Sequence, residues 1–344
     1  MALPDWDGST NRDLPERSGS WAFQMALCLL GPLFFLSYLA SILAPLPTLY
    51  LQLGTANTRR GRTWSLAAVF VGLFLCFAVK GWFWGSLLYF LFAALPAFLI
   101  GELLLRRKGP EMAILGAVFA VALATTVCAW GVARSRGLEL IPAVRQSTEA
   151  FLKEKAEFLL SQKKNEIPEE TRLALEQLRD NPAQELDTMP GMGLFTLLLL
   201  CTLPVVALIR WNPKGFLRRT GIPRDFLRKW KSPEWMVWPA LFCGAFHIFE
   251  VAVLSDLARN ALIPILLIYF FHGMSILAFF LDSLRLRGPF RVVFYGAAIL
   301  FLIPMVVSFG FFDLWFNFRS RNRPGADTDR DNRDTGKDLD NEEK

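Results

Sequence analysis

The sequence is poor in the residues that build metal sites and disulfide frameworks. It has only two histidines and five cysteines, and every cysteine lies inside an apolar segment far from the next one. Cysteines spaced in this way argue against disulfides and against a metal site made of close Cys pairs. The cysteines are Cys28, Cys76, Cys128, Cys201 and Cys243. We therefore expect no metal and no cofactor.

Enzyme signatures are also missing. The sequence has no Gly-x-Ser-x-Gly elbow, no His-Glu-x-x-His, no Walker loop and no Gly-x-Gly-x-x-Gly before a helix. Three aspartates adjoin the apolar runs, and all three lie at the ends of these runs, where a carboxylate is ordinarily solvated, so catalysis by paired carboxylates is not expected. These aspartates are Asp256, Asp282 and Asp313. We predict that the chain is not an enzyme and has no catalytic residue.

Charged residues are absent from long stretches. No charge occurs from Trp21 to Leu53, and only Lys80 and Glu102 interrupt the run from Trp64 to Leu105. The chain of 344 residues is 53% hydrophobic, with a mean hydropathy of +0.34. Apolar runs of about 20 residues between short charged loops are typical of helices that cross a bilayer. The sequence therefore predicts an all-α, polytopic transmembrane bundle.

The apolar runs predict about eight crossings, at roughly 20 residues each. We place four in residues 21–133 and four in residues 190–318. Residues 45–53, which contain Pro45 and Pro47, either cross or re-enter the membrane. The last three crossings are expected from Trp235 to Ser255, Ala261 to Leu281 and Val292 to Phe312.

Three other segments lie outside the apolar runs. Residues 1–20 are acidic on balance, and residues 319–344 form a charged tail with almost nothing apolar, which should be disordered. Residues 134–189 are rich in Lys, Glu, Gln and Arg, and their apolar spacing predicts two amphipathic helices. These helices either cover the bundle or bind a partner.

The connection at residues 210–231 is strongly basic, with aromatic residues between the basic ones. This pattern occurs in nucleic-acid sites, but beside a membrane it favours an interfacial segment on anionic headgroups. We expect the lipid bilayer as a partner and no nucleic acid. Since Lys and Arg concentrate on the cytoplasmic side of inner-membrane proteins, this connection should be cytoplasmic. With eight crossings, Arg319 then falls on the outer side of the membrane, which conflicts with the same rule.

Both histidines lie at membrane depth. Cys243, His247 and Glu250 share one face of an expected helix, and His272 lies near the middle of the next. With a turn at residues 256–259, His247 and His272 would reach similar depths and could meet. Tyr269, on the helix of His272, completes the candidate site for a small molecule.

Three roles stay open for these histidines. They hold a transition metal with the glutamate and thiol, they relay protons or receive a polar substrate, or they only fix packing by hydrogen bonds to a carbonyl or a hydroxyl. Tyr269 and Ser275 are hydroxyls within reach along the same helix.

Several short stretches resemble the YybS-like family of predicted bacterial integral membrane proteins, a domain of unknown function. They are Pro45-Leu46-Pro47, Arg59-Arg60-Gly61, Asn260-Ala261-Leu262, the run from Leu267 to Met274 and the run from Gly310 to Arg319. The resemblance covers Trp21 to Arg319, and His272 stands where many relatives have Gln, which weakens a metal role. It implies a helical bundle distantly similar to the substrate-binding S-components of energy-coupling factor transporters, with a small-molecule pocket between the last helices and no catalytic residue.

Two functions follow from these observations. The first is a small-molecule binding or transport component of the bacterial inner membrane. The alternative is a structural or assembly protein that recruits membrane-protein partners through the basic connection and the amphipathic insertion.

Overall fold

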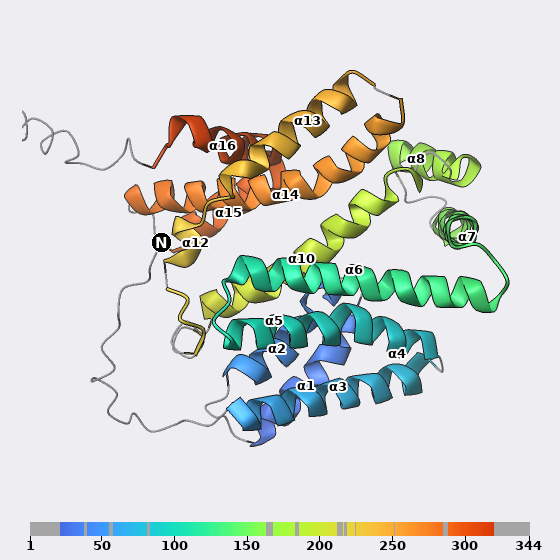
Figure 1. Ribbon diagram of the computed structural model, residues 1–344, viewed down its shortest axis with the longest axis horizontal. Helices are drawn as coiled ribbons and strands as arrows, with labels where there is room; N and C mark the ends of the chain where they lie inside the picture. The colour runs from blue at the N-terminus through green and yellow to red at the C-terminus, as the bar shows by residue number, and fades with distance from the viewer. Residues whose placement is uncertain are drawn as a thin grey trace, which may run out of the picture. The chain divides into compact units, whose positions relative to one another are not determined.

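The computed structural model describes residues 21–37, 40–54, 58–80, 83–162, 168–182, 186–211, 216, 219–223, 225–250, 252–284 and 288–319. Every regular element within these ranges is helical, which confirms the all-α prediction (Figure 1). The chain forms two compact units, one of residues 1–147 with 196–224 and one of residues 148–195 with 225–344. The expected disordered tail lies outside the described residues, except for Arg319.

Five of the expected crossings are confirmed as helices long and apolar enough to span a membrane. Each has at least 21 residues, which at about 1.5 Å per residue covers the hydrocarbon core. A π-helical turn, η3, joins two of the shorter helices into one span. The spans are α3 (Thr58–Lys80), α4 (Phe83–Tyr89) with η3 (Phe90–Ala94) and α5 (Leu95–Leu105), α6 (Pro110–Ser135), α10 (Met189–Trp211) and α14 (Ala252–Ser283).

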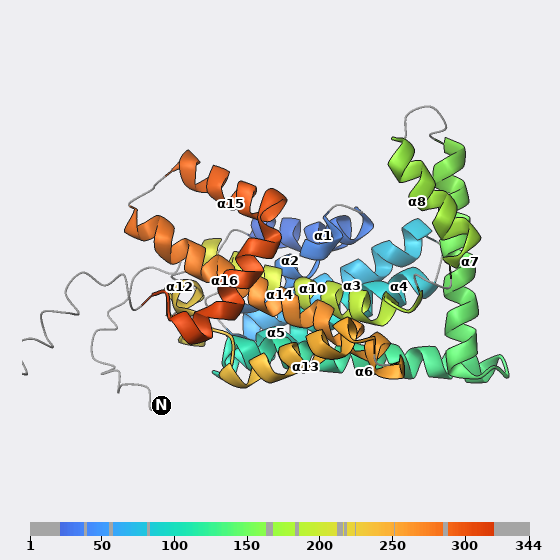
Figure 2. The ribbon, with the colours of Figure 1, turned by 90° about the horizontal axis from the view of Figure 1, so that it is seen from above.

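The other three expected crossings are not confirmed, so the described chain has five to six candidate spans. Helix α1 (Trp21–Leu36) has 16 residues and α13 (Val237–Ile248) has 12, which correspond to only about 24 and 18 Å. Helices α15 (Pro289–Phe301) and α16 (Ile303–Phe316) are bent by 96° where one span was expected (Figure 2). They make the sixth span only if the bent pair counts as one.

The short helix α2 (Pro45–Gly54) lies inside the first unit. It has 10 residues, about 15 Å, so it is too short to cross a bilayer, and most of its side chains are buried. Of the two alternatives for residues 45–53, this favours a re-entrant piece, since backbone that does not cross is tolerated at membrane depth when protein covers it.

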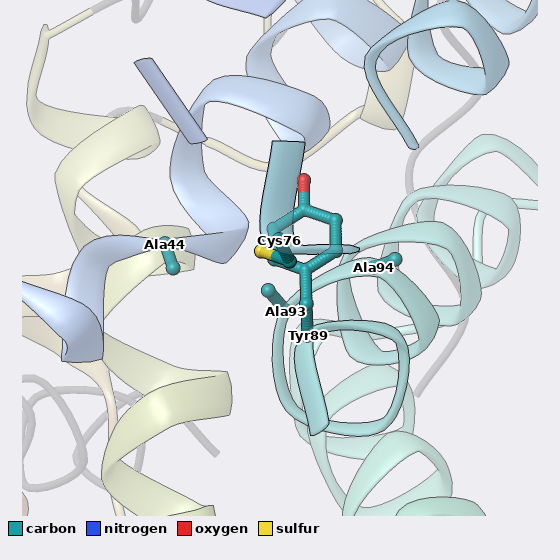
Figure 3. Close-up of a cluster of buried hydrophobic side chains, with 5 residues drawn as sticks. All are labelled: Ala44, Cys76, Tyr89, Ala93 and Ala94. Atoms are coloured by element: carbon teal, nitrogen blue, oxygen red, sulfur yellow. The ribbon is translucent and has the colours of Figure 1, made fainter. Parts of the chain in front are cut away.

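A cluster of buried side chains holds the first unit together (Figure 3). The Tyr89 ring is fully buried and packs beside Cys76 of α3, with Ala44, Ala93 and Ala94 completing the cluster. The small neighbours leave room for the large ring, and a side chain at Gly72 would collide with it. Close packing of this kind is what joins helices in lipid, where the hydrophobic effect contributes little.

The second unit is built on the antiparallel hairpin of α13 and α14, which lie side by side in Figure 1. Helix α16 packs closely against α14 at two glycines. A Cβ on Gly273 would fall on the carbonyl oxygen of Val306, and a Cβ on Gly310 would fall on that of Tyr269. Backbone contact at two points fixes how α16 crosses α14.

The amphipathic insertion contains α7 (Leu140–Gln162) and α8 (Glu169–Asp180). Two of its aromatic side chains are exposed, Phe151 to 53% and Phe158 to 52%, whereas Leu152 is buried at 8%. The Lys155 ammonium lies 5.6 and 5.7 Å from the centroids of these two rings. The side of α7 that carries Phe151 and Phe158 is therefore left uncovered.

Candidate functional site

A buried histidine and a buried aspartate form a pair in the second unit. His272 Nε2 of α14 lies 3.1 Å from Asp313 Oδ2 of α16, and the two side chains are 4% and 1% exposed. The other carboxylate oxygen, Oδ1, accepts the backbone N–H of Phe318 at 2.9 Å. The contacts at Gly273 and Gly310 bring the two helices close enough for this pair. A buried carboxylate is costly without such partners.

The other nitrogen of the imidazole is also held. His272 Nδ1 lies 3.0 Å from the Ser232 hydroxyl. A carboxylate only accepts hydrogen bonds, so a neutral imidazole carries its proton on Nε2, toward Asp313, and accepts the Ser232 proton at Nδ1. The Trp230 ring meets the imidazole edge-on, with centroids 6.2 Å apart. These three contacts together fix the orientation of the imidazole ring.

Arg319 closes the cluster beyond the end of α16. Its Nη2 donates to the Ser275 hydroxyl at 2.6 Å and to the Trp230 carbonyl at 2.9 Å, and its Nη1 donates to the Arg228 carbonyl at 3.1 Å. Burial lowers the pKa of this guanidinium, and the charge of Asp313 opposes the shift. We call His272, Asp313, Ser232, Ser275 and Arg319 the His272 network.

The His272 network bears on the topology conflict found in the sequence. Arg319 bonds directly to the carbonyls of Arg228 and Trp230, which end the basic connection. Groups in hydrogen-bond contact lie at the same depth, so the end of α16 is on the same side as that connection. With α13 too short to cross, α14 and the bent pair α15 and α16, counted as one span, make two crossings between them, an even number that agrees with this contact.

A reporter fused after Arg323 is therefore expected to give the same topology signal as one inserted after Lys231. Both positions follow segments that Arg319 ties together, and the positive-inside rule puts both in the cytoplasm. Paired alkaline phosphatase and green fluorescent protein fusions measure the side. A periplasmic signal at Arg323 with a cytoplasmic one at Lys231 would contradict the contact.

The expected grouping of the two histidines is not found. Helix α13 ends at Ile248, so His247 and Glu250 lie at the turn and are exposed. His272 lies 20 positions after Ala252, which begins α14, and is thus about 30 Å along that helix. The similar depth predicted for His247 and His272 was wrong, because the turn comes before residue 252 and not at residues 256–259.

The remaining candidate residues lie apart in the same unit. Cys243 is half-buried on α13, near the turn. Tyr269 is 3% exposed, and its ring meets the Phe311 ring edge-on at 5.2 Å. Its carbonyl oxygen underlies Gly310. Ligand binding by the five candidates stays a prediction, while the contacts of Tyr269 are those of packing.

Sequence reasoning missed three members of the His272 network: Ser232, Asp313 and Arg319. Asp313 was set aside as a solvated residue at a helix end, yet it is 2% exposed. One signal was available, since Asp313 is the only charged residue between Arg291 and Arg319. An ionisable residue alone within an apolar segment indicates a functional or structural partner.

A pocket of about 340 Å³ opens beside the network, where α13 begins and α16 ends. Its lining is mostly apolar, with three indoles and one carboxylate. Glu234 follows Ser232 by two positions and Leu314 follows Asp313 directly, so the pocket and the network share their backbone segments. The lining side chains are Glu234, Trp235, Val237, Trp238, Leu241, Leu314 and Trp315.

Metal ligation finds no support in the part of the chain that the structure describes. There, no three His, Cys, Asp or Glu side chains come together as a metal ion would require. His272 faces one carboxylate and one hydroxyl, both hydrogen-bonded to it.

Comparison with protein families gives a match over most of the chain. The family described as predicted membrane protein, DUF2232, matches residues 22–314, which is most of the chain. Neither the curated proteins nor the solved structures contain a match.

Proposed function

The chain belongs to this DUF2232 family of predicted membrane proteins, and we propose that it is a small-molecule binding or transport component of the bacterial inner membrane. The pocket beside the His272 network carries the proposal. Its volume of about 340 Å³ lies in the range of small-molecule sites, and an apolar lining with few polar groups is typical of them. A role like that of the S-component of an energy-coupling factor transporter is part of this proposal.

We further propose that the protein has no catalytic activity, although Ser232, His272 and Asp313 are linked as in a serine hydrolase. A nucleophile has to face its substrate, and Ser232 does not line the pocket. The imidazole is enclosed, with both nitrogens engaged and the side chain 4% exposed. These contacts support a network that holds the pocket's backbone segments in place.

A structural or assembly role is the second candidate. It is favoured by the exposed apolar face of the insertion, where Phe151 and Phe158 are uncovered in their unit, together with Leu173, which is 55% exposed. An exposed apolar face on an extramembrane helix suits a partner helix or a membrane surface.

Native mass spectrometry of the protein released from its own membrane in dodecyl maltoside tests the binding proposal. We expect a bound small molecule, lost in Trp238→Ala because an indole of the pocket is removed, and kept in Trp130→Ala, an equally exposed tryptophan of α6. The molecule should be recovered chemically unchanged after incubation at the growth temperature.

Absence of any bound molecule, in the wild type and after mixing with a membrane extract, would contradict the binding proposal. Conversion of the molecule into a product by the wild type would contradict the absence of catalysis. A stable protein partner that is lost in Phe151→Ser with Phe158→Ser, and no bound molecule, would support the structural role.

A further inference from the structure

The pocket at the start of α13 combines aromatic rings with a single carboxylate. Trp235, Trp238 and Trp315 line it, and each is more than half exposed. The rings therefore offer indole surface that no other side chain of the unit covers. Glu234 is the only charged residue in the lining. This combination determines whether the pocket favours a cationic or an anionic ligand.

Glu234 has no ion pair or hydrogen bond among the described residues, although the segment just before it in the sequence is basic. The nearby cations each have another partner: Lys231 Nζ lies 3.2 Å from Asn317 Oδ1, and Arg228 pairs with Asp282 at 3.0 Å. Lys229 pairs with Asp225, whose pKa is lowered by that contact. The carboxylate thus faces the pocket without the countercharge that neighbouring acids have.

Indole faces attract cations, because the ring quadrupole is negative over the face. An unpaired carboxylate among such rings also attracts cations, and it repels anions. A hard metal ion is disfavoured, since it would need several oxygen ligands and the lining offers one carboxylate among apolar groups. A cation with a carbon surface fits both the rings and the acid.

We propose that this pocket binds an organic ammonium group, held by the indoles of Trp235, Trp238 and Trp315 and by the carboxylate of Glu234. The inference rests on the proposed binding function and names the chemical class of the ligand. The ammonium belongs either to a soluble amine or to the headgroup of a zwitterionic phospholipid, because tryptophans at helix ends lie where headgroups lie.

Choline and its neutral isostere 3,3-dimethyl-1-butanol separate charge from shape. We measure the thermal melting and tryptophan fluorescence of the purified protein in dodecyl maltoside, with sodium chloride matching the ionic strength. Choline should raise the melting temperature saturably and the isostere should not. Glu234→Gln should weaken choline binding about tenfold or more, whereas Glu139→Gln, another exposed glutamate, should not.

Nanodiscs distinguish the two sources of the ammonium group. If the ligand is a lipid, phosphatidylethanolamine should stabilise the wild type relative to phosphatidylglycerol, and Glu234→Gln should abolish the difference. If it is a soluble amine, the two lipids should act alike and choline should still bind. Either the lipid effect or choline binding supports the inference, provided that Glu234→Gln abolishes the effect that is observed.

Three results would overturn the inference. They are an isostere effect equal to that of choline, retention of choline binding in Glu234→Gln, and no response to choline or to phosphatidylethanolamine. If native mass spectrometry still detects a bound molecule that Trp238→Ala loses, the binding function stands and only the ligand class is wrong. Since Glu234 is exposed, its substitution should leave the melting temperature without ligand unchanged.

Discussion

Asp313→Asn is expected to lower the free energy of unfolding by about 3 kcal/mol, because it breaks a buried, hydrogen-bonded pair. Both carboxylate oxygens accept: Oδ2 from His272 Nε2 and Oδ1 from the N–H of Phe318. An asparagine side chain keeps the shape but has one accepting oxygen and one donating nitrogen. With the amide oxygen on the Phe318 N–H, the amide nitrogen faces His272 Nε2, so the imidazole has to leave the tautomer that donates to position 313, and the hydrogen bond to a charged carboxylate is lost.

Asp256→Asn is the matched control for this substitution. Asp256 lies on α14 in the same unit and pairs with Arg259, but its side chain is 62% exposed. Exposed ion pairs contribute about 0 to 1 kcal/mol, so this variant should lose little. Reversible unfolding in mixed micelles measures both, and a double-mutant cycle with His272→Leu isolates the coupling of the pair. Equal small losses for Asp313→Asn and Asp256→Asn would show that the buried pair is not formed.

Gly310→Ala is expected to destabilise the protein by about 3 kcal/mol, at the upper end of what overpacking costs. The new Cβ would fall on the carbonyl oxygen of Tyr269, and the backbone of α14 has no flexible atom there that can give way. Gly273→Ala should behave alike, because its Cβ would fall on the Val306 carbonyl of α16. Both changes push α16 away from α14 and so lengthen the contact between His272 and Asp313.

Gly296→Ala on α15 supplies a control of opposite sign. Nothing lies within 4 Å of a Cβ at Gly296, so alanine there should stabilise the helix by up to about 1 kcal/mol through its better helix propensity. The melting temperature of the three variants in dodecyl maltoside gives the comparison. A stabilising effect of Gly310→Ala similar to that of Gly296→Ala would contradict the close approach of α14 and α16.

These two predictions bear on function through the same segments. The His272 network ties the residues before α13 to the end of α16, and the pocket is lined by the residues that follow Ser232 and Asp313. Loss of the pair should therefore loosen the pocket as well as the unit. If the proposed binding function holds, Asp313→Asn should also weaken binding, without touching a pocket side chain.

The membrane class of the protein and five of its spans could be predicted from the sequence. Whether a helix such as α6 or α10 spans a bilayer depends on its own length and on its own lack of charge, both of which are local properties. The crossings expected at α1, α13 and the pair α15 and α16 are not confirmed, and the bent pair makes a sixth span only if it counts as one. There, apolar runs of sufficient length are interrupted by helix ends that hydropathy does not mark.

The sequence by itself determined that charges are largely kept out of the apolar runs and that a few ionisable groups lie within them. Only the tertiary structure decided which of them meet. Helical spacing places His247 and Glu250 on one face of a helix. The turn that follows them comes a few residues earlier than expected, so they lie beside the start of α14, about 30 Å along that helix from His272. The partner of His272 is instead Asp313, 41 positions later, because Gly273 and Gly310 let the backbones of α14 and α16 come into contact. Contacts so distant in sequence depend on how helices cross, which no local pattern specifies.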